Sequence, residues 1–365
     1  MTDRADVVVI GGGQSGLAAA YALLRRGLRP VVLEASQRMA GSWPRYYDSL
    51  VLFSPVWYNS LPGLPFDGDP DHYPRRDEVV SYLSAYAARL DADLRTGHRV
   101  RAVRRAGPGS GTGPGFGSGP GFEVETEEGD PVLARAVVAA SGSFGRPHRP
   151  GLPGLTGFTG TVLHAAEYRV PAPFAGQRVI VVGAGNSALQ IAVELSAVAR
   201  VTLATRAPIQ YAPQCVLGRD LHFWLARLGF DRAPLGRVLR NPPTPPVIDD
   251  GRYRAAVTRG EPDQRPLFTG ADGTKVTWAD GTREEVDTIV LATGYRPDLP
   301  YLAALDGALA PDGRPRQRGG IALAHPELAY VGLEWQHSAT SNSLRGSGRD
   351  ATRIARRLAA RLRRH

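Results

Sequence analysis

Three glycines near the start of the chain have the spacing of a phosphate-binding turn. Gly11, Gly13 and Gly16 follow the apolar run Val7–Ile10 and open a stretch rich in alanine and leucine. In a strand–turn–helix unit the first glycine permits the turn, the second lets backbone amides approach a pyrophosphate, and the third lets helix and strand pack closely. Glu34 ends the next apolar run, where a carboxylate accepts hydrogen bonds from ribose hydroxyls and repels a 2′-phosphate. The pattern predicts a dinucleotide site for FAD or NAD.

A second glycine turn repeats this plan but lacks the acid. Gly183, Gly185 and Ala188 again follow a β-branched run and open a helix-like segment. Arg206, with Thr205 beside it, ends the following strand. A guanidinium at that place can pair with a ribose 2′-phosphate in two hydrogen bonds, which favours NADP. The alternative is that Arg206 only solvates a loop.

The elements that must position these turns follow from the periodicity of apolar residues. The repeated units predict strands at residues 5–10, 31–34, 178–182 and 201–206, with a helix after each glycine turn. The first helix would bury a face made by Leu17, Tyr21, Leu24 and Leu28, and the second a less regular face made by Leu189, Ala192, Val193 and Ser196. We also expect a helix over 77–90 and strands near 98–105, 122–126 and 136–140. Two such units predict two nucleotide-binding domains.

Connections and the C-terminal segment complete the expected organisation. Residues 107–121, almost wholly Gly, Pro and Ser, predict a hairpin loop without function, and residues 241–246 predict a stiff surface excursion in the second domain. The run 288–291 predicts a buried strand that returns the chain to the first domain. Ile354, Leu358 and Leu362 recur every four residues among arginines, which predicts an amphipathic closing helix.

Composition excludes several classes of protein. The 365 residues suffice for about two domains, and no apolar run is long enough to span a bilayer. The net charge of +9 comes from arginines scattered along the chain, so we expect neither nucleic-acid nor membrane binding. Cys215 is the only cysteine, which excludes a disulfide framework, a redox cysteine pair and a cysteine-based metal cluster. We expect a cytoplasmic protein without a metal site.

One further string is far more specific than a glycine turn. Phe158, Gly160, His164 and Tyr168 fit the pattern FxGxxxHxxxY just before the second glycine turn. Here the chain resembles the flavin-containing monooxygenases, the class B flavoprotein monooxygenases. The resemblance extends over Gly41-Ser-Trp43, Ala140-Ser-Gly142 and Ala292-Thr-Gly-Tyr295, and the segment from Tyr47 to Tyr73-Pro is similar to small bacterial members and to the plant auxin-forming branch.

This resemblance implies a fold and a reaction. The fold would be α/β, with two Rossmann-like dinucleotide-binding domains in a three-layer, disulfide-reductase-like architecture. The FAD-binding domain would comprise residues 1–157 and 288–365, and the NADPH-binding domain residues 158–287. The enzyme would use NADPH, FAD and O2 to form a C4a-hydroperoxyflavin, which passes one oxygen atom to a small organic substrate. Tyr168 stands where the related Baeyer–Villiger pattern has tryptophan, which favours oxygenation of sulfur or nitrogen.

Two alternatives stay open. The first is Baeyer–Villiger oxidation of a ketone by the same intermediate. The second is a flavoprotein that oxygenates nothing, either a redox sensor or an NADPH oxidase. A disulfide reductase would need a redox cysteine pair, which the lone Cys215 cannot form. The family resemblance also suggests a homodimer.

The resemblance also implies the residues of the site. His164 is expected to be structural or conformational. From the sequence pattern alone, the third glycine string of Gly346, Gly348 and Ala351 has no clear strand before it and predicts only a glycine-lined helix start. Well-studied members place an asparagine over the flavin, at a position that Phe53 occupies here or that Asn59 replaces, and these two are the candidate catalytic residues. The residues expected to bind the cofactors are Gly11, Gly13, Ser15, Gly16, Glu34, Ala35, Ser42, Trp43, Val100, Ser141, Gly142, Gly183, Gly185, Asn186, Ser187, Ala188, Thr205, Arg206, Thr293 and Gly294.

Overall fold

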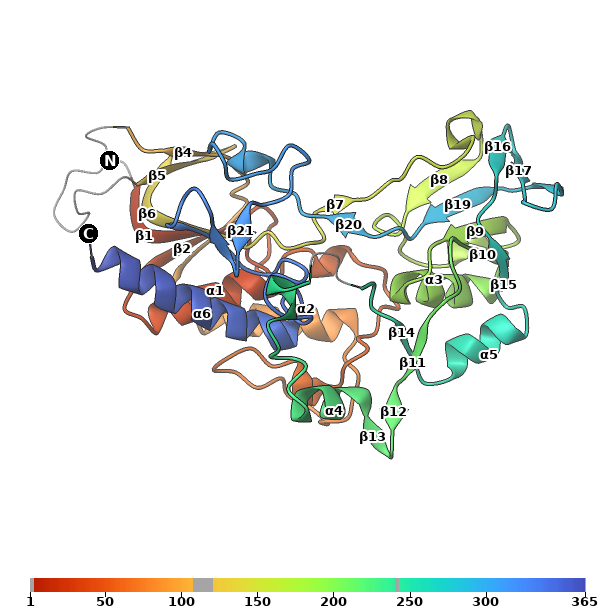
Figure 1. The fold of residues 1–365 in the computed structure, drawn as a ribbon, viewed down its shortest axis with the longest axis horizontal. Helices are drawn as coiled ribbons and strands as arrows, with labels where there is room; N and C mark the ends of the chain where they lie inside the picture. Colours follow the sequence, from red (N-terminus) through yellow and green to blue (C-terminus); the bar gives the residue numbers. More distant parts are fainter. Residues whose placement is uncertain (1–2, 108–120, 240–242, 365) are drawn as a thin grey trace.

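Two mainly parallel sheets, each with its own helices, form the molecule (Figure 1). The computed structural model describes residues 3–107, 121–239 and 243–364. The first sheet lies beside α1 and α6, and the second lies beside α3, with β7 and β20 crossing between them. This is the α/β, two-unit architecture that the paired glycine turns predict.

The first sheet has nine strands. Its main path runs β21-β22-β23-β6-β1-β2-β3, and β4 and β5 extend it from β6 as an antiparallel pair. The strands from β3 to β23 by way of β1 are parallel neighbours. The bounds are β1 Asp3–Ile10, β2 Pro30–Glu34, β3 Asp93–Thr96, β4 Val100–Arg105, β5 Phe122–Thr126, β6 Val132–Ala139, β21 Gln317–Arg318, β22 Ile321–Ala322 and β23 Leu328–Tyr330.

Strand β1 shows why this sheet is central to the unit. Val7, Val8 and Val9 are fully buried, because the sheet is covered on both faces. One face packs against α1 (Gln14–Leu24), α2 (Arg76–Ala88) and α6 (Leu344–Leu362), and the other against residues 299–308. The core therefore fixes the carboxyl end of β1, where the first glycine turn begins.

The helices largely follow the predicted pattern. The α6 helix buries Ile354, Leu358 and Leu362, and its first two turns hold Gly346 and Gly348, which confirms the amphipathic closing helix with a glycine-lined start. The predicted first helix was too long, because α1 ends at Leu24 and Gly27, with φ of +74°, turns the chain toward β2. Leu28 lies in that connection, where it still packs against the core.

The second sheet has five parallel strands in the order β15-β10-β9-β19-β8. The bounds are β8 Thr161–His164, β9 Arg178–Val182, β10 Arg200–Thr205, β15 Asp263–Pro266 and β19 Thr288–Leu291. The α3 helix (Asn186–Ser196) covers one face, and the three-stranded sheet of β16 (Gly270–Asp272), β17 (Lys275–Thr277) and β18 (Arg283–Glu285) adjoins the other.

The position of β19 differs from the predicted boundary at residue 288 between the second domain and the returning part of the first. This buried strand pairs with β8 and β9, so it belongs to the second sheet rather than to the first unit. The chain returns only after Leu291, through the turn at residues 292–294 and β20 (Tyr295–Arg296), which pairs with β7 (Arg146–Pro147). The sequence marked a buried apolar strand but could not say which sheet it joins.

An excursion from the second unit spans residues 211–249. Its two ends pair in parallel as β11 (Tyr211–Pro213) and β14 (Val247–Asp249). Between them lie the hairpin of β12 (Cys215–Val216) and β13 (Arg219–Asp220) and the helix α4 (Leu221–Arg227), and α5 (Arg252–Thr258) follows. Residues 243–246 are exposed as the proline-rich pattern predicts, whereas residues 240–242 lie outside the described part.

The hairpin expected from the strands near 98–105 and 122–126 is present. Strands β4 and β5 pair antiparallel, which confirms the hairpin, although residues 108–120 of its loop lie outside the described residues. The edge strand β3 was not predicted, since its short, charged sequence shows no apolar alternation. Among the helices described, none is sufficiently long and apolar to cross a membrane.

Candidate dinucleotide sites and their junction

The first glycine turn lies where β1 ends and α1 begins. Gly11 has φ of +107°, and a Cβ there would press on the carbonyl of Ala140, at the end of the neighbouring strand. A Cβ on Gly16 would overlap the carbonyl oxygen of Gly11, so the helix can start this close to the turn only with glycine. Gly13 is the N-cap of α1 and no side chain caps the helix, so its first amides remain available to an anion.

The carboxylate of Glu34 faces this turn. Its Oε2 accepts a hydrogen bond from the backbone amide of Gly12 at 2.6 Å, and its Oε1 accepts one from Ser36 at 2.8 Å. The residue is 6% exposed. Each oxygen keeps further acceptor capacity. A ribose diol can therefore be held beside the pyrophosphate-binding turn.

The other residues expected at this site surround the same edge. Trp43 donates from its indole to Gln14 of α1, while Ser42 bonds the hydroxyl of Tyr46. Ser15 is buried at the start of α1, and the hydroxyl of Ser141, after β6, bonds that of Tyr301. The remaining members lie close by: Ala35 exposed after Glu34, Gly142 after Ser141, and Val100 two residues beyond His98, whose amide bonds the Glu34 carbonyl.

The second glycine turn occupies the matching edge of the second sheet. Gly183 has φ of +151°, and a Cβ there would strike the carbonyl of Ala292. Gly185 is the N-cap of α3, again without a side-chain cap. Asn186 accepts a hydrogen bond from the amide of Ile248 at 3.2 Å, Ser187 is exposed and Ala188 is buried. The free amides of α3 offer a second anion site.

The end of β10 carries positive charge. Thr205 is buried and is the last residue of the strand, and Arg206 follows it with an exposed side chain. Burial, and then the charges of Arg296, Arg206 and Arg146, lower the pKa of His148. Arg206, directly after β10, and His148, whose amide bonds the Gly294 carbonyl after β19, both lie at the carboxyl edge of the second sheet, where positive charge suits a phosphate.

The FxGxxxHxxxY residues connect the carboxyl edge of the second sheet with the segment that returns the chain to the first unit. His164 is fully buried, its Nε2 donates to the Gly294 carbonyl at 3.0 Å and its Nδ1 accepts from the Ala166 amide at 3.1 Å. Thr293 bonds the His148 carbonyl. Tyr168 is buried and donates to Glu194 at 2.7 Å. Both ring nitrogens of His164 are occupied by backbone, which agrees with a structural role.

Acid should weaken this junction through His164. Burial lowers its pKa, although the hydrogen bond to Gly294 acts in the opposite direction. The unfolded chain then binds the proton more readily, so this contribution is complete above about pH 6.5 and falls as pH drops below it, by at most about 1.4 kcal/mol per pH unit. We expect urea unfolding between pH 7.5 and 5.5 to show a smaller loss for His164→Gln than for the parent chain. Equal losses would contradict this.

The two candidate catalytic residues differ sharply in their surroundings. Asn59 is 2% exposed, and its amide donates to the carbonyls of Ser54 and Pro55 at 2.7 and 2.9 Å and accepts from the Ser54 hydroxyl at 2.9 Å. Its side chain therefore closes a local turn. Phe53 is 41% exposed and stacks on His222. The structure brings Phe53, not Asn59, to an open surface, and the catalytic assignment of both stays a prediction.

Some polar residues near these edges were missed by sequence reasoning. Gln14 joins Trp43 to the carbonyl of Asn342 at the start of α6. Ser143 is buried and bonds the Gly332 carbonyl and the Glu334 amide. Their signal is only their position, directly within or after a glycine turn at the carboxyl end of a strand.

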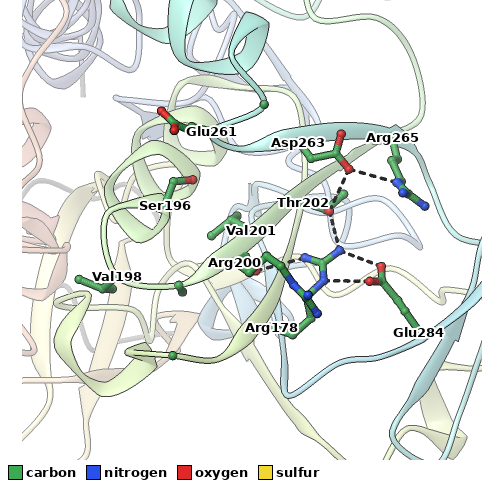
Figure 2. Close-up of a pocket in the computed structure, with 13 residues that line it drawn as sticks. Arg178, Ser196, Val198, Arg200, Val201, Thr202, Glu261, Asp263, Arg265 and Glu284 are labelled. Atoms are coloured by element: carbon green, nitrogen blue, oxygen red, sulfur yellow. Dashed lines mark hydrogen bonds and ion pairs between the residues drawn. The ribbon is translucent and has the colours of Figure 1, made fainter.

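A cavity of about 710 Å³ lies at the opposite edge of the second sheet (Figure 2). Arg178 and Arg200, the first residues of β9 and β10, line it. The guanidinium of Arg178 holds Glu284 through two hydrogen bonds, of 2.9 and 2.7 Å, and also bonds Thr202. Because nucleotides bind at the carboxyl ends of parallel strands, this cavity is not the dinucleotide site.

Two sheets whose central strands are parallel, each with a bare helix N-terminus at its carboxyl edge, define a two-dinucleotide oxidoreductase. Residues 8–217, more than half of the chain, match the model of the pyridine nucleotide-disulphide oxidoreductases, and the chain belongs to this family. An uncharacterised, CzcO-like oxidoreductase of Geobacillus kaustophilus is 30% identical over 350 residues, 95% of this chain and 96% of that protein.

The more informative relatives are monooxygenases. A flavin-containing monooxygenase from Stenotrophomonas maltophilia is 35% identical, covers 99% of both chains and superposes with a TM-score of 0.84. An indole-3-pyruvate monooxygenase of Oryza sativa subsp. japonica is 30% identical over 383 residues, 96% of this chain and 90% of that protein. The protein is therefore a flavin-dependent monooxygenase of the class B type, with FAD and NADPH as its cofactors and O2 and a small molecule as its substrates.

The residues present fit these cofactors. A Cβ at Gly11 or Gly183 would fill the space beside a neighbouring strand, and both helix N-termini lack a capping side chain. The acid Glu34 at the first edge suits a plain ribose, and Arg206 at the second suits a phosphorylated one.

Proposed function

We propose that this enzyme oxygenates sulfur or nitrogen in a small organic substrate, with FAD in the first site and NADPH in the second. The contrast between the two edges carries the proposal, because an acid follows the first turn and an arginine the second. Tyr168, where a Baeyer–Villiger pattern would have tryptophan, supports a soft heteroatom rather than a ketone as the target. Its hydroxyl is bonded to Glu194, so it acts by packing rather than by contact with substrate.

A bound flavin supplies the activation of dioxygen, and the chain supplies binding and orientation. The first amides of α1 would hold the pyrophosphate, and Glu34 the ribose hydroxyls. The first amides of α3 would hold the second pyrophosphate, with Arg206 on the 2′-phosphate. His164 fixes the turn at Gly294 against β8, so it sets the position of one edge relative to the junction.

The test is the coupling between NADPH oxidation and oxygen transfer. The purified enzyme would be given NADPH with aryl methyl sulfides, tertiary amines or cyclic ketones, while NADPH, hydrogen peroxide and products are measured. We expect sulfides or amines to accelerate NADPH oxidation, suppress peroxide and give about one sulfoxide or N-oxide per NADPH. Lactones from ketones alone would indicate Baeyer–Villiger oxidation. Peroxide equal to NADPH with every compound would indicate an oxidase or a sensor and refute the proposal.

A further inference from the structure

A buried histidine lies between the two units and is not used by the proposed mechanism. His222 is the second residue of α4 and is fully buried. Its Nδ1 lies 2.8 Å from Oδ1 of Asp220, whose Oδ2 accepts from the hydroxyl of Tyr73 and, at 2.7 Å, from Gln214. Within the described part of the chain, Nε2 of His222 has no hydrogen-bond partner. Hydrogen bonds from Tyr73 and His222 to Asp220 thus link the first unit to the excursion 211–249. At the end of this network, Nε2 of His222 is left as an unpartnered acceptor.

The partners of His222 decide where its proton lies. Burial raises the pKa of Asp220, but hydrogen bonds from His222, Tyr73 and Gln214 outweigh this and hold it below its usual value, so the carboxylate only accepts. Burial lowers the pKa of His222, with a further decrease from Arg345 that Asp220 and Asp231 oppose. The neutral ring therefore carries its proton on Nδ1, toward Asp220, and presents a lone pair at Nε2.

Aromatic rings from the first unit cover this imidazole. Phe53 stacks on it with centroids 6.1 Å apart and an interplanar angle of 23°, and Tyr58 lies at 6.0 Å. Phe53 is itself 41% exposed, so the ring that stacks on the buried imidazole also reaches the surface. The family resemblance places a residue over the flavin at the position of Phe53 or, as the alternative, of Asn59. If Phe53 is that residue, the imidazole stacked on it, with its unpartnered Nε2, adjoins the expected reaction centre.

We propose that Nε2 of His222 accepts a hydrogen bond from an N–H or O–H group of the substrate and so selects substrates that carry such a donor. This inference rests on the proposed function, because it names the substrate class of that same site. Phe53 moves aside as the substrate enters. A buried acceptor without a partner is costly, and a donor on the ligand removes that cost. A pocket built around such a group discriminates against analogues that lack the donor.

A matched pair of sulfides tests this directly. Methyl phenyl sulfide and 4-(methylthio)aniline share the sulfur, but only the second carries N–H donors. Dissociation constants would be measured by calorimetry with the oxidised holoenzyme, in which no turnover occurs, and kcat and KM separately. We expect the parent enzyme to prefer the aniline by about tenfold, from one hydrogen bond. His222→Leu should remove this preference, mainly through the dissociation constant and KM, and His222→Gln, which keeps an acceptor, should restore part of it.

His325 provides the matched control. It is also buried, bonds the carbonyl of Asp306 at 2.8 Å and packs near Phe122 in the other unit. His325→Leu should lower stability without changing the preference. The inference is overturned if the parent enzyme binds both sulfides equally, or if His222→Leu keeps the parent's preference. Peroxide equal to NADPH with both sulfides would instead refute oxygenation, and the binding constants would still decide the role of His222.

Discussion

Replacement of Gly16 by alanine is expected to yield a protein that is purified without flavin. The added Cβ would overlap the carbonyl oxygen of Gly11, which is backbone and cannot rotate away. Either α1 moves back from the turn or the turn opens, and both displace the amides that receive the pyrophosphate. Overpacking of this kind costs about 1–3 kcal/mol in the free energy of unfolding, and occasionally more when backbone must shift. The measurement is the ratio of flavin to protein absorbance after purification, together with thermal unfolding.

Gly151→Ala is the control for this substitution. Gly151 lies in the same chain, its φ is not in the left-handed region, and a Cβ there meets nothing within 4 Å. This variant should retain flavin and unfold with the parent. A Gly16→Ala protein with full flavin content and unchanged unfolding would show that the helix start is not as tightly placed as the structure has it.

The predictable parts of the site are those in which a short stretch of sequence admits only one local structure. Gly11, Gly16 and Gly183 are glycines because a side chain would collide with neighbouring backbone, and such positions can be recognised from their place between strand and helix. The closing helix was equally clear, since Ile354, Leu358 and Leu362 form one buried face. Regular apolar periodicity and positions that sterically require glycine can both be recognised from the sequence itself.

Contacts between segments that are distant in the sequence cannot be recognised in this way. The run 288–291 is apolar whichever sheet it joins, and only its pairing with β8 and β9 places it in the second unit. His222 and Tyr73 meet through Asp220 although about 150 positions separate them. Asn59 looked like a candidate for chemistry, but its amide is used by the carbonyls of its own turn. Which polar groups remain available depends on tertiary packing.

Arg206→Gln is expected to raise the KM for NADPH by about 10- to 100-fold and to leave the KM for NADH unchanged. Arg206 is exposed directly after β10, at the carboxyl edge where the free amides of α3 lie. A hydrogen-bonded guanidinium–phosphate pair contributes about 1.5–3 kcal/mol, which corresponds to that range. Steady-state kinetics with both nucleotides, at fixed ionic strength because exposed charges are screened, is the measurement.

Arg200→Gln is the control that distinguishes loss of a specific phosphate contact from a general loss of positive charge. It is the first residue of the same strand and is also exposed, but it lies at the amino end, on the side of the cavity in Figure 2. Arg200→Gln removes the same charge and should change neither KM. If Arg206→Gln behaves like Arg200→Gln, the 2′-phosphate is held elsewhere, and Arg146 and Arg296, which share the neighbourhood of His148, become the residues to replace. Equal losses for NADPH and NADH would instead mean that Arg206 supports the fold of this edge rather than recognising the phosphate.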